Sequence, residues 1–191
     1  MAGARRVGSR KLMAVERREF IGCLGLILAG VARGAGAQGR TYRPLARPVV
    51  IPLDDLATPW RAKAFIADGV TLSSAATPNQ PIRIDGMIVR ISAGNEPDRF
   101  AALVAKCPHE GCEVDFVPDP NKLPPEVKDE IGHPVKDSVY VCPCHNSTFM
   151  ATDGERMAGP APRGLYSFKI TGVTNAAVEI GEVEEDVLIF V

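Results

Sequence analysis

The chain has 191 residues, 46% of them hydrophobic, so it is long enough for one well-buried domain and too short for two of full size. Its 18 Gly, 16 Pro and low aromatic content of 6% favour a turn-rich β protein over a helical bundle. The net charge of −1 combines a basic segment, residues 1–37 with seven Arg/Lys and two Asp/Glu, with an acidic body that holds 15 of the 22 basic and 21 of the 23 acidic side chains, a balance that argues against nucleic-acid binding.

Residues 1–37 have the order of an export signal. Basic residues 5–18 precede an apolar run at 20–32, and Ala35-Gly36-Ala37 forms a small-x-small cleavage site. Arg17-Arg18, shortly before the apolar run, is typical of a twin-arginine signal, which exports proteins already folded around a cofactor. We expect a mature protein that begins near Gln38, on the periplasmic side of the inner membrane. The alternative is a retained N-terminal anchor, although 13 apolar residues fall short of the roughly 20 that a membrane span needs.

The rest of the sequence predicts an all-β barrel or sandwich. Residues 38–48, rich in Arg and Pro, predict a polar linker, and the acidic residues 182–186 predict a solvated turn. Asp85-Gly86 lies between two strand-like runs and is typical of a β-hairpin. Short strand-like runs separated by turn residues occur at 49–53, 64–66, 82–84, 87–91, 100–104, 138–141, 165–170, 177–180 and 187–191.

The strand pattern stops between Val117 and Asp137. Residues 118–137 therefore predict an insertion, with one helical turn near 126–131, that faces a partner or only decorates the domain. His133 within it has no cysteine nearby, so we expect a solvent-exposed loop histidine rather than a metal ligand.

Four of the five cysteines lie in two short clusters with histidine, Cys107-Pro-His109-Glu-Gly-Cys112 and Cys142-Pro-Cys144-His145. Such clustering indicates a metal site. The clusters offer six ligands, whereas a structural zinc closes with four. A [2Fe–2S] centre of Rieske type takes two thiolates on one iron and two imidazoles on the other, and each cluster can supply one of each. Cys112 and Cys144 are then surplus, and in an oxidising compartment they are natural disulfide partners.

The sequence resembles the Rieske iron–sulfur proteins, specifically the disulfide-bearing branch of cytochrome bc and b6f complexes and arsenite oxidase. Three ordered motifs carry the resemblance: C-x-H-x-G-C at 107–112, C-P-C-H-x-S at 142–147, and G-P-A-P at 159–162 followed by Leu165. The resemblance implies a Rieske β domain over residues 49–191, with a cluster-binding subdomain at about 105–165.

By position, the resemblance also assigns the individual residues. Cys107 and Cys142 would bind the buried iron, and His109 and His145 the outer iron. The hydroxyl of Ser147 would donate to a bridging sulfide, and Cys112 and Cys144 would form the family's disulfide.

Two residues depart from the commonest respiratory form of the family. Asn146 replaces a frequent glycine, which is tolerable because asparagine accepts left-handed backbone angles. Phe149 stands where a tyrosine usually donates to a ligand sulfur. Since that donor would favour the reduced cluster, its loss predicts a potential in the middle of the family's span of roughly −150 to +300 mV.

The resemblance implies one-electron transfer as the iron–sulfur subunit of a quinol-oxidising cytochrome bc-type complex. His145 and His109 would accept a hydrogen bond from quinol at cytochrome b, and the electron would pass to a c-type cytochrome. The chain would then be an electron-transfer subunit of an oxidoreductase complex, associated with the membrane through that complex or an anchor. The alternatives are the small subunit of an arsenite-oxidase-like molybdoenzyme, a free periplasmic Rieske carrier and, remotely, a non-redox zinc module.

Overall fold

A computed structural model describes residues 39–71 and 81–187. The predicted twin-arginine signal, cleavage site and anchor lie outside the described residues, as does most of the last predicted strand. Within the described ranges, no helix has the length and apolar character needed to cross a membrane.

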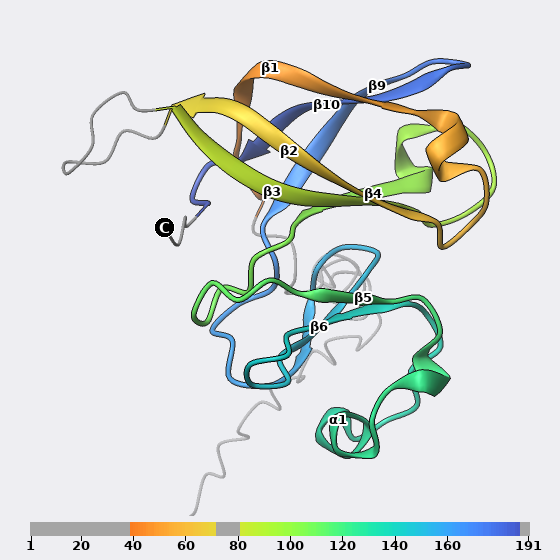
Figure 1. Ribbon diagram of the computed structural model, residues 1–191, viewed down its shortest axis with the longest axis vertical. Helices are drawn as coiled ribbons and strands as arrows, with labels where there is room; N and C mark the ends of the chain where they lie inside the picture. The colour runs from red at the N-terminus through yellow and green to blue at the C-terminus, as the bar shows by residue number, and fades with distance from the viewer. Residues whose placement is uncertain (1–38, 72–80, 188–191) are drawn as a thin grey trace, which may run out of the picture. The chain divides into compact units, whose positions relative to one another are not determined.

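The larger of two antiparallel sheets has six strands in the order β1-β10-β9-β4-β3-β2. Besides pairing with β10, strand β1 lies close to β2, so the sheet curls into a nearly closed, barrel-like form (Figure 1). The strands are β1 (Tyr42–Pro52), β2 (Ala62–Thr71), β3 (Pro81–Arg90), β4 (Phe100–Val104), β9 (Ser167–Val173) and β10 (Ala177–Glu184).

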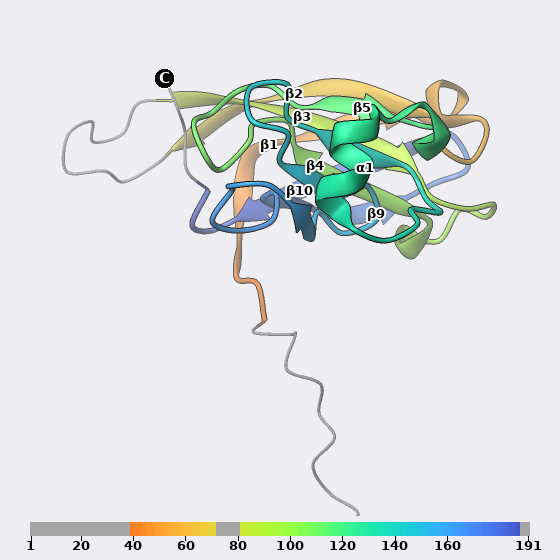
Figure 2. The ribbon, with the colours of Figure 1, turned by 90° about the horizontal axis from the view of Figure 1, so that it is seen from below.

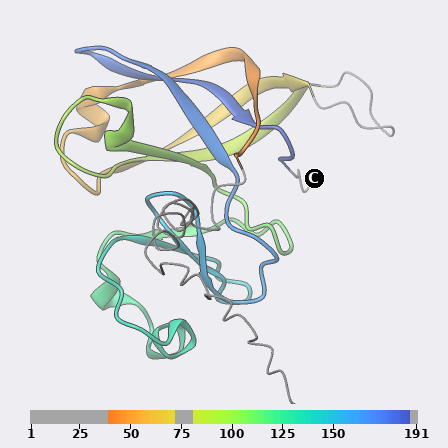
Figure 3. The ribbon, with the colours of Figure 1, turned by 180° about the vertical axis from the view of Figure 1, so that it is seen from behind.

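The smaller sheet is inserted between β4 and β9 of the larger one. It has the order β5-β6-β7-β8, so each strand pairs with its neighbour in sequence, and it lies to one side of the six-stranded sheet (Figures 1 and 3). Its short strands are β5 (Asp115–Val117), β6 (Val139–Val141), β7 (Thr148–Met150) and β8 (Arg156–Ala158). The described chain is thus mostly β, which confirms the predicted fold class.

Strand alternation divides the apolar side chains between two cores. In β3, Ile88 packs into the cluster inside the curled sheet, whereas its neighbour Val89 packs into a second cluster with Tyr140 and Phe149 of the smaller sheet. The thiols of the second cluster, Cys107 and Cys142, are buried with it. The outer face of the larger sheet therefore packs against the part of the chain that carries both cysteine–histidine motifs.

The insertion is folded and has a small core of its own. It contains the 3-10 helix η3 (Pro120–Lys122) and the helix α1 (Pro125–Ile131), which confirms the predicted helical turn. Val127 and Ile131, one turn apart, are both buried and pack with Val139 and Ala158 of the smaller sheet. Figures 1 and 2 show α1 beyond this sheet as seen from the larger one.

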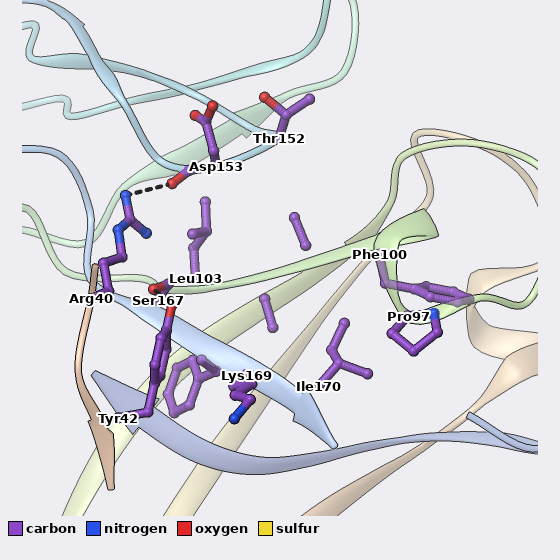
Figure 4. Close-up of a pocket in the computed structure, with 13 residues that line it drawn as sticks. Arg40, Tyr42, Pro97, Phe100, Leu103, Thr152, Asp153, Ser167, Lys169 and Ile170 are labelled. Atoms are coloured by element: carbon purple, nitrogen blue, oxygen red, sulfur yellow. Dashed lines mark hydrogen bonds between the residues drawn. The ribbon is translucent and has the colours of Figure 1, made fainter. Parts of the chain in front are cut away.

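The predicted linker is folded in part, because β1 begins at Tyr42 rather than near residue 49. Two polar side chains of this segment find partners: Arg40 Nη2 donates to the Asp153 carbonyl oxygen at 3.0 Å, and the Tyr42 hydroxyl lies 2.8 Å from Ser167 Oγ. Figure 4 shows both residues at the wall of a pocket of about 290 Å³. Arginine and proline content indicated a linker, but these tertiary contacts hold the segment as a strand.

The Asp85-Gly86 hairpin prediction is wrong, since both residues lie within the continuous strand β3. Gly86 pairs with Phe65 across the sheet, and a Cβ at Gly86 would come within 3.0 Å of the rings of Phe65 and Phe168. The glycine is needed here for close ring packing and not for a turn.

Candidate metal centre

The two cysteine–histidine loops have the same backbone hydrogen-bond pattern. In the first, the Cys107 amide donates to the Cys112 carbonyl oxygen at 2.8 Å, and the Gly111 amide donates back to that of Cys107 at 2.9 Å. In the second, the Cys142 amide donates to the Ser147 carbonyl oxygen at 2.8 Å, and the Asn146 amide donates back to that of Cys142 at 3.0 Å.

Each loop turns at a residue with positive φ in the same position, four after its first cysteine. These residues are Gly111 at 75° and Asn146 at 57°. Asparagine is one of the few residues other than glycine that adopt this conformation readily. The expectation for Asn146 is confirmed, and the substitution leaves the loop geometry intact.

A disulfide between Cys112 and Cys144 joins the two loops, as the ligand count and the resemblance implied. The two cysteines are 32 residues apart in sequence, with the whole insertion between them. Strand β5, which follows the first loop, pairs with β6, which precedes the second. The disulfide adds a covalent link between the two loops.

The remaining cysteines of the motifs, Cys107 and Cys142, are free thiols that are 0% and 1% exposed. Burial raises the pKa of Cys107, as does the neighbouring Cys142 thiol, while hydrogen bonding by the His109 backbone and the Ser147 side chain acts in the opposite direction. The Cys107 thiol therefore resists ionisation, and a bound metal would compensate for that cost.

The two histidines lie side by side at the surface. The rings of His109 and His145 are 4.8 Å apart between centroids, with planes at 81°, and their side chains are 28% and 44% exposed. Nδ1 of His109 is buried and has no hydrogen-bond partner among the described residues. A buried ring nitrogen without a partner is what a metal-ligating imidazole leaves when the metal is not included.

Ser147 connects the second loop to the segment of Gly159-Pro-Ala-Pro162. Its Oγ accepts a hydrogen bond from the Ala161 amide at 3.1 Å, which leaves the hydroxyl hydrogen to interact with the Cys107 sulfur. Gly159, at φ 88°, packs so closely on Ser147 that a Cβ would fall within 3.0 Å of its Cα, N and Oγ. The proline segment thus covers the second loop directly.

Phe149 lies opposite Tyr140 in the β6–β7 ladder, and both side chains are fully buried in the cluster that contains the two thiols. The Tyr140 hydroxyl has no hydrogen-bond partner among the described residues, and burial raises its pKa. Phe149, at the position of the family's tyrosine, has no hydroxyl to donate. The nearby hydroxyl in the same core belongs to Tyr140.

The structure brings together the candidate ligands Cys107, Cys142, His109 and His145, with Ser147 beside them. His133 is exposed, in agreement with the expectation for it.

Sequence reasoning overlooked two charged residues near this centre. Glu110 has carboxylate oxygens 4.0 Å from Nε2 of His109 and 3.8 Å from Nδ1 of His145. Glu184 was expected in a solvated turn, but it is buried and pairs with Arg163, which directly follows the proline segment. The only signal for Glu110 was its place inside the motif, and for Glu184 the apolar alternation of β10 around it.

The donor set fits a [2Fe–2S] cluster, since two buried thiols and two surface imidazoles supply two sulfur and two nitrogen ligands. A single zinc ion would not explain why the two loops hold their sulfur donors buried and their nitrogen donors at the surface. The group formed by Cys112, Cys142 and Cys144 is no alternative site, because two of these residues form the disulfide.

Comparison with known protein families agrees with this chemistry. The profile of the family described as "Rieske [2Fe-2S] domain" matches residues 71–169. Among solved structures, the chain is similar to the plasma membrane Rieske protein PetC3 of the cyanobacterium Synechocystis PCC 6803, with 24% identity over 59% of this chain and 96% of that one, at a TM-score of 0.30. No curated protein matches the chain.

Proposed function

This chain belongs to the Rieske [2Fe–2S] domain family and serves electron transfer with a [2Fe–2S] cluster, and we propose that the cluster is held by Cys107, Cys142, His109 and His145. The observation that carries the assignment is the depth of the donors: both thiols are buried, and both imidazoles reach the surface. When bound, such a cluster takes up and releases one electron.

Three groups of residues around the proposed centre have different roles. The apolar cluster around Cys107 and Cys142 excludes water from the sulfur side. The half-exposed rings of His109 and His145 form the face that an electron donor or acceptor can reach. The hydroxyl of Ser147, with its oxygen already accepting from Ala161, is placed to donate one hydrogen bond inward.

Within this function, we propose the role of iron–sulfur subunit in a quinol-oxidising cytochrome bc-type complex. The support is the G-P-A-P segment, which packs on Ser147 and resembles the covering loop of the respiratory proteins. His145 and His109 would accept a hydrogen bond from quinol at cytochrome b, and a c-type cytochrome would receive the electron.

A second candidate is the small subunit of an arsenite-oxidase-like molybdoenzyme, or a free periplasmic carrier. Phe149 favours it, because the buried side chain at this position has no hydroxyl to offer a ligand sulfur. This candidate would be exported through a twin-arginine signal that is cleaved near Gln38. A retained N-terminal anchor would fit it less well.

Cluster ligation is tested on the full chain purified without oxygen. We expect iron and acid-labile sulfide in equal amounts, two of each per chain, and the low-average-g EPR signal of a Rieske centre in the reduced protein. His145→Ser is expected to abolish the signal, whereas His133→Ser, the matched histidine of the insertion, is expected to preserve it. Stoichiometric zinc without this signal would contradict the assignment.

The choice of complex is tested by isolation from native membranes and by N-terminal sequencing. Co-purification of b-type and c-type haem supports the bc-type role, whereas molybdenum in the complex supports the second candidate. A mature protein that begins near Gln38 would count against an anchored bc subunit.

A further inference from the structure

Glu110 occupies a distinct place between the two candidate ligand histidines. It follows His109 in the first loop, and its carboxylate also approaches His145 of the second loop, at 4.0 and 3.8 Å from the nearest ring nitrogens. Both distances exceed the 3.5 Å limit for a hydrogen bond. The carboxylate therefore acts on both imidazoles through its charge rather than through a directional bond.

Within the described ranges, no cation offsets this charge at close range. Among the residues that the structure describes, no Lys or Arg nitrogen lies within 4.0 Å of the Glu110 carboxylate. Lys106, on the approach to the same loop, pairs instead with Asp85 at 3.5 Å. Glu110 thus places a negative charge, 60% exposed to solvent, at the surface where the electron enters and leaves.

We propose that Glu110 lowers the reduction potential of the cluster, a role that rests on the proposed ligation by His109 and His145. Reduction adds one negative charge to the centre, and a carboxylate this close to both imidazoles repels that charge. The reduced state is then disfavoured relative to the oxidised state. Because Glu110 is more than half exposed, water screens the repulsion, so the expected effect on the equilibrium is about threefold to tenfold. For a one-electron couple, tenfold corresponds to about 59 mV.

The test is an EPR-monitored redox titration of the cluster-loaded full chain, with all variants at pH 7 and one ionic strength. Glu110→Gln keeps the shape of the side chain and removes its charge, so we expect the equilibrium to shift about threefold to tenfold toward the reduced state. Glu110→Lys reverses the charge and should shift it further in the same direction. Glu130→Gln, the same chemical change on the exposed face of α1, should leave the potential unchanged.

Ionic strength gives a second readout, which does not depend on the lysine variant. Added salt screens the carboxylate, so the potential of the unmodified protein should rise with salt more than that of Glu110→Gln. This comparison still tests the proposal if the lysine variant fails to hold the cluster.

The possible failures are distinguishable. An unchanged potential in Glu110→Gln, together with an unchanged EPR spectrum, overturns the role of Glu110 and leaves the ligation standing. Absence of a Rieske signal from the unmodified protein overturns the ligation itself, and with it this inference.

Discussion

At the scale of single residues, Gly159 shows how little room separates the proline segment from the second ligand loop. With a φ of 88° and a virtual Cβ that overlaps the backbone of Ser147, it excludes any side chain. We predict that Gly159→Ala lowers the free energy of unfolding by about 3 kcal/mol, from backbone strain and steric overlap together. Denaturant unfolding, with iron content as a second readout, measures the loss.

Gly132 provides the matched control for this variant. It ends α1 with a φ of 74°, yet nothing lies within 4 Å of its virtual Cβ. Gly132→Ala should therefore cost only the conformational strain, about 1 kcal/mol. Equal losses in the two variants would contradict the proposed packing of Gly159 on Ser147.

Residue chemistry was predictable from sequence where it depends on local pattern. The grouping of donors into two motifs identified the candidate ligands and the disulfide, and the place of Asn146 in its motif indicated its left-handed conformation. Glu110 and Glu184 were missed because their surroundings come from other parts of the chain. No local pattern places a carboxylate beside a histidine of a different loop.

At the scale of elements, a partly buried ion pair connects the proline segment to β10. The Arg163 guanidinium lies 3.8 Å from the ring centroid of Tyr166 and pairs with Glu184, whose carboxylate also accepts from the Ser167 amide at 3.1 Å. Because the Glu184 side chain is only 7% exposed, water screens its interaction with Arg163 weakly. Removal of the Glu184 charge would therefore destabilise Arg163. The pair thus fixes the C-terminal end of the segment that covers the candidate centre.

We predict that Glu184→Gln lowers the free energy of unfolding by about 2 kcal/mol, since it leaves the partly buried Arg163 charge without its partner. Glu182→Gln, two residues earlier in the same strand, is the control. Glu182 pairs with Lys169 at the surface, where an ion pair contributes less than about 1 kcal/mol. Chemical denaturation measures both variants, and a loss in Glu182→Gln as large as that in Glu184→Gln would refute the distinction between the two pairs.

Strands were predictable where the alternation of apolar and polar residues was clear. The predictions failed where tertiary contacts determine the conformation of the segment. The predicted strands at 64–66, 100–104 and 177–180 all lie within observed strands. Asp85-Gly86 has the composition of a turn, but ring packing of Phe65 and Phe168 keeps it in a strand. The insertion was predicted as a loop that faces a partner or only decorates the domain, and its packing through Val127 and Ile131 against β6 and β8 was not predicted.

At the scale of the whole molecule, charge is distributed in a way that affects its encounters. Residues 38–191 hold 15 basic and 21 acidic side chains, and one of the acidic ones, the exposed Glu110, lies at the surface beside the two histidines. A net negative body with a carboxylate at the proposed electron-transfer face suits a positively charged partner. Long-range attraction of this kind raises the association rate more than the final affinity.

We therefore predict that oxidation of the reduced protein by a positively charged c-type cytochrome slows as ionic strength rises. Between about 0.01 M and 0.15 M salt the Debye length falls from about 30 Å to about 8 Å, which removes most of the attraction at encounter distances. Stopped-flow measurement should show a second-order rate constant several-fold lower at the higher salt. Hexacyanoferrate, an anionic oxidant, is the control, and its rate should rise over the same range because salt screens repulsion. A cytochrome rate that rises in parallel with the hexacyanoferrate rate would exclude electrostatic attraction of such a partner.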